Sequence, residues 1–265
     1  MLGIVAYSAL NFAALLNPAA QVAEPPEPVP QSEGDIFPPP TTGQTLIVGE
    51  FHGSAEIPAM FLDLVRRTAR ERPVVVGLEL PPSTERLQCR LGGRLPMSWL
   101  RPSQDGRTSV AMRDLVCALR MRFRSERVRI VYLSDEGPRG DDFDLVAAAR
   151  YHEALSRRPA AGLILTGSYH ARNAEGTIAH HLRARGVDLI TAVVSAPVSQ
   201  AWHCRNDGSC GSAEVRINFC SQGASAADRP RWYAVRATPA TWDYCLSVPR
   251  LTASPPASGA RGTAD

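Results

Sequence analysis

The central part of the chain alternates between short apolar runs and longer segments in which apolar residues recur at helical spacing. The apolar runs, rich in β-branched residues, cover residues 45–49, 73–80, 128–133, 161–166 and 189–195. Between them, the spacing of apolar residues predicts helices over residues 57–68, 109–124, 143–155 and 174–185. Buried strands that alternate with helices are typical of an α/β fold. We therefore predict a largely parallel central sheet flanked by helices on both faces.

The pattern changes beyond about residue 200, where cysteines become more frequent. The segments RWYAVRAT and YCLSV, which begin at Arg231 and Tyr244, are rich in residues that favour strands. We expect them to add antiparallel strands, so that the fold has a cysteine-containing C-terminal edge.

The two ends of the chain carry patterns of a different kind. Residues 2–16 form an apolar run that is too short for a comfortable membrane span. With the small residues that follow, the run predicts a signal peptide or N-terminal anchor over residues 1–23, and membrane contact only through this segment if it stays uncleaved. The proline-rich residues 24–43 predict a linker. We expect one domain over residues 44–257 and a disordered tail over residues 258–265.

The chain has six cysteines, and an even number in an exported chain favours disulfides over free thiols. Cys204 and Cys210 bracket the turn-forming sequence RNDGS, which a disulfide could close, although the sequence leaves the pairing of the six cysteines open. The rival interpretation is a zinc site at His203 and Cys204, although no CxxC pair accompanies it. Together with the N-terminal segment, the cysteines predict an exported protein, either periplasmic or secreted.

The charge of the chain gives no sign of a nucleic-acid partner. Its 29 basic residues, all of them arginine, face 26 acidic residues, and the net charge is only +3. The arginines are spread from Arg66 to Arg261 and form no basic cluster in the sequence. We therefore expect a small-molecule or peptide substrate and no nucleic acid.

Polar side chains follow four of the predicted strands at the point where each strand ends. Glu50 and His52 follow the first strand, Glu79 ends the second, Asp135 follows the third and His170 follows the fourth. The carboxyl ends of parallel strands meet at one edge of a sheet, which is where α/β proteins place their sites. If these strands are adjacent, their acids and imidazoles converge on one cleft.

Each of these residues also has a structural alternative. Glu50 can cap a turn and Asp135 can form one. His52 can hydrogen-bond a loop carbonyl, and His170 can be a core or capping histidine. A buried Glu79 can pair with a structural arginine. Two histidines with two or three carboxylates suit a divalent metal ion such as zinc, manganese, iron or cobalt, or acid–base catalysis. A metal with an open coordination position would activate water. Both uses stay open at this point.

The two histidine motifs resemble those of a known superfamily. It contains the erythromycin esterases, ChaN-like haem-binding proteins, TraB/PrgY proteins and Tiki proteases. Residues 49–52 (GEFH) and 167–170 (GSYH) are similar to its paired GxxH motifs, and Glu79 is similar to its strand-end glutamate. The resemblance spans roughly residues 44–257, and the layout is most similar to the ChaN-like branch. It implies a mixed sheet flanked by helices around one shared pocket.

From the converging side chains and this resemblance, we expect an exported, metal-dependent hydrolase of ester or amide bonds. His52 and His170 would ligate the metal or act as bases. Glu50 would activate water, and Glu79 would position a histidine or complete the ligand set.

Two other functions stay open. The ChaN-like relatives imply a haem- or tetrapyrrole-binding protein without catalysis, with Tyr169 and His170 as candidate iron ligands. A domain that uses the fold only for protein contacts is the third possibility. Relatives often carry an Arg-Asp pair before the second motif, where this chain has GDDFD at residues 140–144. Arg139 and Arg150 are the candidates for that arginine.

Overall fold

The structure is a computed structural model that describes residues 39–90, 93–100, 106–136, 140, 142–204, 209–215, 230–235 and 241–258. The predicted signal or anchor segment, most of the linker, Arg139 and nearly all of the predicted tail lie outside these residues. Within the described part of the chain, no helix has the length and apolar character that crossing a bilayer requires.

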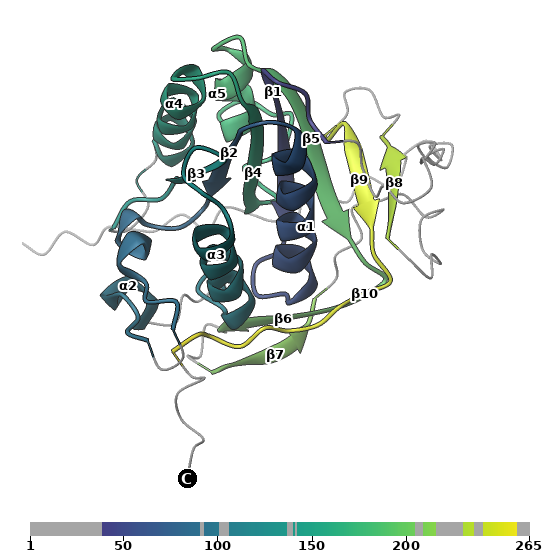
Figure 1. Cartoon of the computed structure of the whole chain (residues 1–265). Coiled ribbons are helices and arrows are strands. Elements are labelled where there is room, and N and C mark those ends of the chain that lie inside the picture. Colours follow the sequence, from purple (N-terminus) through teal and green to yellow (C-terminus); the bar gives the residue numbers. More distant parts are fainter. Residues whose placement is uncertain are drawn as a thin grey trace, which may run out of the picture.

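A seven-stranded sheet forms the centre of the molecule (Figure 1). Its order is β3 (Val128–Tyr132), β2 (Val74–Leu78), β4 (Ala161–Gly167), β1 (Gln44–Glu50), β5 (Asp188–Ser195), β9 (Tyr244–Ser247) and β8 (Arg231–Ala234). All of its strand pairs are parallel except β8 with β9 at one edge. The predicted parallel sheet and its antiparallel C-terminal edge are therefore confirmed.

Helices cover both faces of this sheet (Figure 1). They are α1 (Glu56–Glu71) and α3 (Val110–Arg122) on one face, and α4 (Phe143–Ser156) and α5 (Ile178–Arg183) on the other. The short helix α2 (Met97–Leu100) and the 3₁₀ helix η2 (Pro82–Arg86) lie at the periphery (Figure 1). Leu46 of β1 belongs to the core that contains α1 and α3, whereas its neighbour Ile47 belongs to the core with α4 and α5. Successive side chains of a strand point to opposite faces. The continuous apolar run of β1 therefore fills two cores.

Helix α5 is shorter than the helix predicted over residues 174–185. It begins after Thr177, whose hydroxyl accepts a hydrogen bond from the backbone N–H of His180 and so caps the helix. Gly176, directly before the cap, has a φ of +78°, which is incompatible with a right-handed helix. The cap and this glycine together set the later start.

A second sheet lies beside the N-terminal ends of α1 and α3 (Figure 1). Its order is β10 (Arg250–Leu251), β6 (Val198–Cys204) and β7 (Cys210–Glu214). Strand β6 is antiparallel to β7 and parallel to β10. The sheet contacts the loop after β1, because the backbone N–H of Trp202 donates to the carbonyl of Gly53 at 3.1 Å.

Two disulfides join cysteines of the described residues. Cys89, after η2, is bonded to Cys117 of α3, and Cys204 at the end of β6 is bonded to Cys210 at the start of β7. Cys245 of β9 is disulfide-bonded as well. The predicted closure of the RNDGS loop is confirmed. The zinc interpretation is wrong, because the sulfur of Cys204 is not available as a thiolate.

Candidate active site

The carboxyl ends of three neighbouring strands bring the predicted polar residues together. β4 lies between β1 and β2, with Gly167 paired to Glu50 on one side and Leu165 paired to Leu78 on the other. Glu50 and Glu79 therefore leave their strands on either side of the end of β4. This convergence depends on the adjacent, parallel arrangement that the sequence predicted.

His52 lies between two buried carboxylates. Its Nδ1 atom is 3.0 Å from Oε1 of Glu50, and its Nε2 atom is 3.6 Å from Oε1 of Glu79. The imidazole is 13% exposed and both carboxylate side chains are only 2% exposed, so water screens the charges weakly. An imidazole that faces an acceptor at each nitrogen satisfies both when it carries two protons.

Glu79 is held by donors from three directions. Its Oε2 atom accepts hydrogen bonds from the hydroxyl of Thr166 at 2.6 Å and the backbone N–H of Gly167 at 2.7 Å. Its Oε1 atom accepts from Nη1 of Arg107 at 3.2 Å. A buried carboxylate needs such partners because an unpaired buried charge is costly. These donors satisfy the buried carboxylate and hold it in one position beside His52. The structural interpretation of Glu79 predicted an arginine partner. That partner is Arg107, and it is itself part of the site.

His170 forms the second pair of an imidazole and a carboxylate. Its Nδ1 atom lies 2.8 and 3.0 Å from the two carboxylate oxygens of Asp144, in the first turn of α4. Asp144 also accepts from the backbone N–H of Ile178, at the start of α5. The ring of Phe143 packs edge-on against the His170 imidazole, 4.8 Å between centroids. The start of α4 therefore fixes both the position and the orientation of His170.

The glycines of the two GxxH motifs make room for each other. A Cβ atom on Gly49 would lie 3.0 Å from Cα of Ser168, within the second motif. A Cβ atom on Gly167 would lie 3.1 Å from Nε2 of His52, in the first motif. The backbone N–H of Ser168 also donates to the carbonyl of Glu50 at 2.8 Å. Each motif therefore needs its glycine so that the other can approach.

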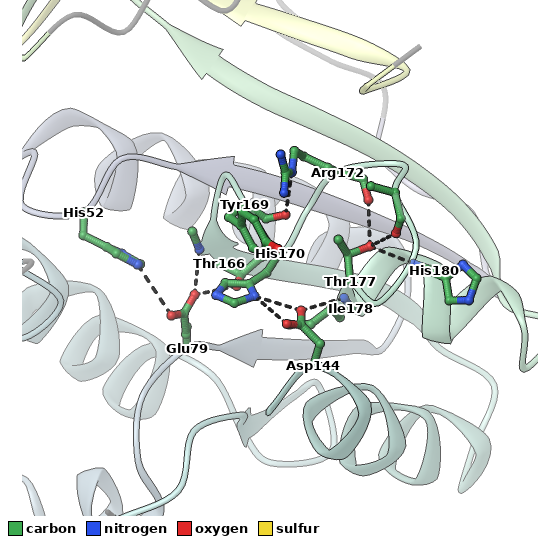
Figure 2. Close-up of polar contacts among 12 residues, drawn as sticks. His52, Glu79, Asp144, Thr166, Tyr169, His170, Arg172, Thr177, Ile178 and His180 are labelled. Carbon is green, nitrogen blue, oxygen red and sulfur yellow. Dashed lines mark hydrogen bonds and ion pairs between the residues drawn. The ribbon is translucent and has the colours of Figure 1, made fainter. Parts of the chain in front are cut away.

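The two histidines share one site. Nε2 of His52 and Cδ2 of His170 lie within 3.1 and 3.6 Å of the point that a Cβ on Gly167 would occupy, and Oε2 of Glu79 lies 3.5 Å from it. Figure 2 shows the imidazole of His52 directed at Glu79 and the imidazole of His170 between Glu79 and Asp144. The predicted residues Glu50, His52, Glu79 and His170 are thus gathered at one end of the sheet.

Arg107 owes its place to two glycines in left-handed conformations. Gly53 (φ +81°) follows His52, and Gly106 (φ +78°) precedes Arg107. A Cβ on Gly106 would lie 2.6 Å from Cα of Gly53 and 2.5 Å from the carbonyl oxygen of Trp202. The loops that carry His52 and Arg107 therefore touch through their backbones, which requires glycine in both.

Other predicted residues lie outside this group. Asp135 makes an ion pair with Arg150 of α4 at the surface, so it is not part of the site, and the guanidinium of Arg150 is engaged there. Tyr169 is 60% exposed, and the guanidinium of Arg172 lies 3.9 Å from the centre of its ring. Arg139, the other candidate arginine, lies outside the described residues.

Sequence reasoning missed Arg107, Asp144 and Thr166 as members of the site. Asp144 could have been found, because it opens a helix directly after the third strand, on the side of the sheet where the other acids emerge. Arg107 gave no signal, since it is one of 29 basic residues spread along the chain and its approach depends on backbone geometry. Thr166 looked like an ordinary strand residue.

The donor atoms do not fit a bound metal ion as they are arranged. Across the described ranges, no group of three or more His, Cys, Asp or Glu side chains is placed to hold one. Oε2 of Glu79 already accepts two hydrogen bonds, and Arg107 sets a positive charge beside Oε1. A cation at Glu79 would be repelled by that guanidinium.

A groove with a volume of about 470 Å³ lies elsewhere, between α1 and α3. Its lining includes Leu62, Leu115 and Pro255, but neither Tyr169 nor His170. Haem needs a broad apolar pocket next to its iron ligands, and this groove is not next to them.

Comparisons with known proteins support the fold and leave the activity open. No protein-family model matches this chain, and no curated protein matches it. A crystal structure of a Bacillus cereus protein superposes with a TM-score of 0.58 at 8% identity, covering 82% of this chain and 90% of that one. A crystal structure of a succinoglycan biosynthesis protein gives 0.56 at 9% identity, over 80% and 89% of the two chains. At such identities the likeness concerns the fold alone.

Proposed function

We propose that this chain is an exported hydrolase of ester or amide bonds that uses His52 and His170 for acid–base catalysis. The observation that supports this best is the meeting of two imidazole–carboxylate pairs, His52 with Glu50 and His170 with Asp144, at Gly167. Pairs of titratable groups in different environments are how one site supplies both an acid and a base.

His170 is suited to act as the base. Asp144 accepts from Nδ1 at 2.8 Å, which favours the tautomer with its proton on Nδ1 and the lone pair on Nε2. In the proposed reaction, Nε2 takes a proton from water as the water oxygen bonds to the carbonyl carbon of the substrate. Asp144 then stabilises the imidazolium that forms.

His52 is suited to act as the acid. Its imidazole faces a carboxylate at each nitrogen, Glu50 at Nδ1 and Glu79 at Nε2, so each N–H has an acceptor. The 3.6 Å separation from Glu79 is too long for a good hydrogen bond, so the proton on Nε2 is not held tightly. In the proposed reaction that proton goes to the leaving oxygen or nitrogen as its bond to the carbonyl carbon breaks. The two histidines then restore their protons through solvent.

Export is part of the proposal. The disulfides Cys89–Cys117 and Cys204–Cys210 are typical of proteins in an oxidising compartment. They agree with the predicted signal peptide.

Elemental analysis of protein purified from the periplasm or culture medium tests the metal-dependent version of the proposal. A stoichiometric metal that is lost in His52→Ala or His170→Ala would favour a metal site over the acid–base pair.

The decisive experiment is hydrolysis of 4-nitrophenyl acetate and 4-nitroacetanilide by His52→Ala and His170→Ala. We expect kcat/KM to fall by about a hundredfold or more in each variant, since each removes a proton-transfer group. The matched control is His180→Ala, because His180 is exposed on α5. Thermal transitions within about 3 °C of the parent would show that the folds are intact. Full activity in both site variants would end the proposal.

Haem binding without catalysis remains the second candidate. Its support is Tyr169, which is 60% exposed and whose ring centre lies 5.4 Å from that of His170, so a tyrosine oxygen is accessible beside the site. Titration with micromolar haem, compared with Tyr169→Phe, tests it through the Soret band. No shift in the parent protein would remove this function.

A further inference from the structure

The segment that follows β10 binds the loop that carries His52. Residues 252–257, here named the C-terminal strap, start at Thr252. The carbonyl of Thr252 accepts from the backbone N–H of Ala55 at 2.9 Å, and the backbone N–H of Ser254 donates to the carbonyl of Gly53 at 2.7 Å. Gly53 directly follows His52. The strap therefore fixes the backbone next to this histidine.

The other half of the strap binds the loop that carries Arg107. The carbonyl of Pro255 accepts from the backbone N–H of Val110 at 2.8 Å, and the backbone N–H of Ala257 donates to the carbonyl of Thr108 at 2.9 Å. Thr108 directly follows Arg107. One continuous segment thus holds both loops side by side.

Two strap side chains reinforce this arrangement. Thr252 donates its backbone N–H and its hydroxyl to the two carboxylate oxygens of Glu56, at 2.8 and 2.6 Å, and Glu56 begins α1. The hydroxyl of Ser254 accepts from the backbone N–H of Ala111, in the first turn of α3, at 3.0 Å. The strap is therefore attached to the first turns of both helices that follow the two loops.

The two loops act on the same atom. His52 and Arg107 approach Oε1 of Glu79 to 3.6 and 3.2 Å respectively. The backbones of the loops are in contact at Gly53 and Gly106, so a displacement of one loop is passed to the other. A small shift of either loop changes the distance from Oε1 of Glu79 to the imidazole of His52 or to the guanidinium of Arg107. The strength of each electrostatic interaction changes with that distance.

We infer that the C-terminal strap is a positioning element that sets the places of His52 and Arg107 around Glu79, with Thr252 and Ser254 as its positioning residues. Neither side chain touches the imidazole or the guanidinium, so both act through the loop backbones. The effect on reaction rate rests on the proposed function, whereas the effect on the environment of His52 does not.

The test is the double variant Thr252→Val/Ser254→Ala, which removes both hydroxyls and keeps the strap backbone. The first measurement is the Hε1–Cε1 NMR signal of the His52 imidazole, assigned by its absence in His52→Ala, across a pH series. We expect this signal to move in the double variant, because the surroundings of the imidazole change. Thr252→Ser, which keeps the hydroxyl, should keep the parent signal.

Thr191→Val is the matched control, because the Thr191 hydroxyl also bonds a carboxylate, that of Asp243, at 3.0 Å. It should leave the His52 signal unchanged. The second measurement is ester hydrolysis, where we expect kcat to fall by about tenfold with KM within twofold, as for a small misplacement of a catalytic group.

If the double variant fails to fold, Glu56→Gln replaces it, since it keeps the side-chain shape and weakens the bonds to Thr252. An unmoved His52 signal in a folded variant overturns the inference. A moved signal in a protein that hydrolyses nothing would support the positioning role and count against the proposed hydrolase.

Discussion

Nδ1 of His170 lies 2.8 Å from Oδ1 of Asp144, a residue 26 positions earlier in the chain. Asp144 belongs to the helix that follows β3, whereas His170 follows β4, so the pair forms only when the sheet and its helices are assembled. In the proposed reaction this contact fixes the imidazole tautomer.

Asp144→Asn tests that role. The amide keeps the shape of the side chain but presents a donor to Nδ1, which favours the wrong tautomer of His170. We expect kcat for ester hydrolysis to fall by roughly 10–100-fold, with a steady-state measurement as the check. Asp188→Asn, at the exposed start of β5, is the control and should keep full activity. Equal rates for the two variants would show that Asp144 does not orient the base.

Substitution of the first glycine in each GxxH motif, Gly49 or Gly167, should have different effects on stability and activity. Gly49→Ala brings a Cβ to 3.0 Å from the backbone of Ser168, so we expect a loss of about 1–3 kcal/mol in the free energy of unfolding. Gly167→Ala meets the end of the His52 side chain at 3.1 Å, which is able to shift. There we expect a smaller loss of stability and a fall in activity. Urea denaturation and ester hydrolysis separate the two.

Gly211→Ala is the control for both glycine variants, because a Cβ there meets no atom within 4 Å. Its stability and rate should match the parent. If Gly49→Ala behaves like this control, the close approach of the two motifs is not required.

The two disulfides whose cysteines both lie among the described residues should contribute unequally to stability. Cys89 and Cys117 are 28 positions apart, whereas Cys204 and Cys210 are 6 apart. In the chain-entropy model the longer loop stabilises by roughly 3–4 kcal/mol and the shorter by about 2 kcal/mol. Replacing each pair by serines and comparing the unfolding free energies in urea checks this order. A larger loss for the shorter loop would contradict it.

Stability at alkaline pH should depend on Tyr132. Burial raises the pKa of its phenol from 10.0 to about 12. Because the folded pKa is the higher one, the stabilisation is fully present below pH 10 and is lost as the pH rises from about 10 to 12. Tyr132→Phe should therefore lose less stability over this range than the parent. Tyr169→Phe, at an exposed position, should follow the parent curve. Parallel curves for all three proteins would contradict the prediction.

The sequence predicted those site residues that directly follow a strand of the central sheet. Glu50, Glu79 and His170 each emerge at the end of an apolar run, so strand order alone brings them together. Asp135 follows the same rule but does not join them, because β3 is the edge strand of the sheet and α4 supplies Arg150 as a partner.

The remaining site residues depend on contacts between elements that a single sequence does not display. Arg107 reaches Glu79 only because Gly106 and Gly53 let two loops touch. Asp144 reaches His170 only because the first turn of α4 lies beside the loop that follows β4. Neither contact can be predicted from apolar periodicity, because periodicity indicates which side chains of a segment are buried and not which loops are in contact.

The C-terminal strap follows every strand of the central sheet in the order of the chain. A ribosome or a translocation channel delivers a protein from its first residue to its last, so the sheet, both histidines and Arg107 emerge before the segment that fastens them. The proposed site would therefore be completed only after every strand of the central sheet has emerged.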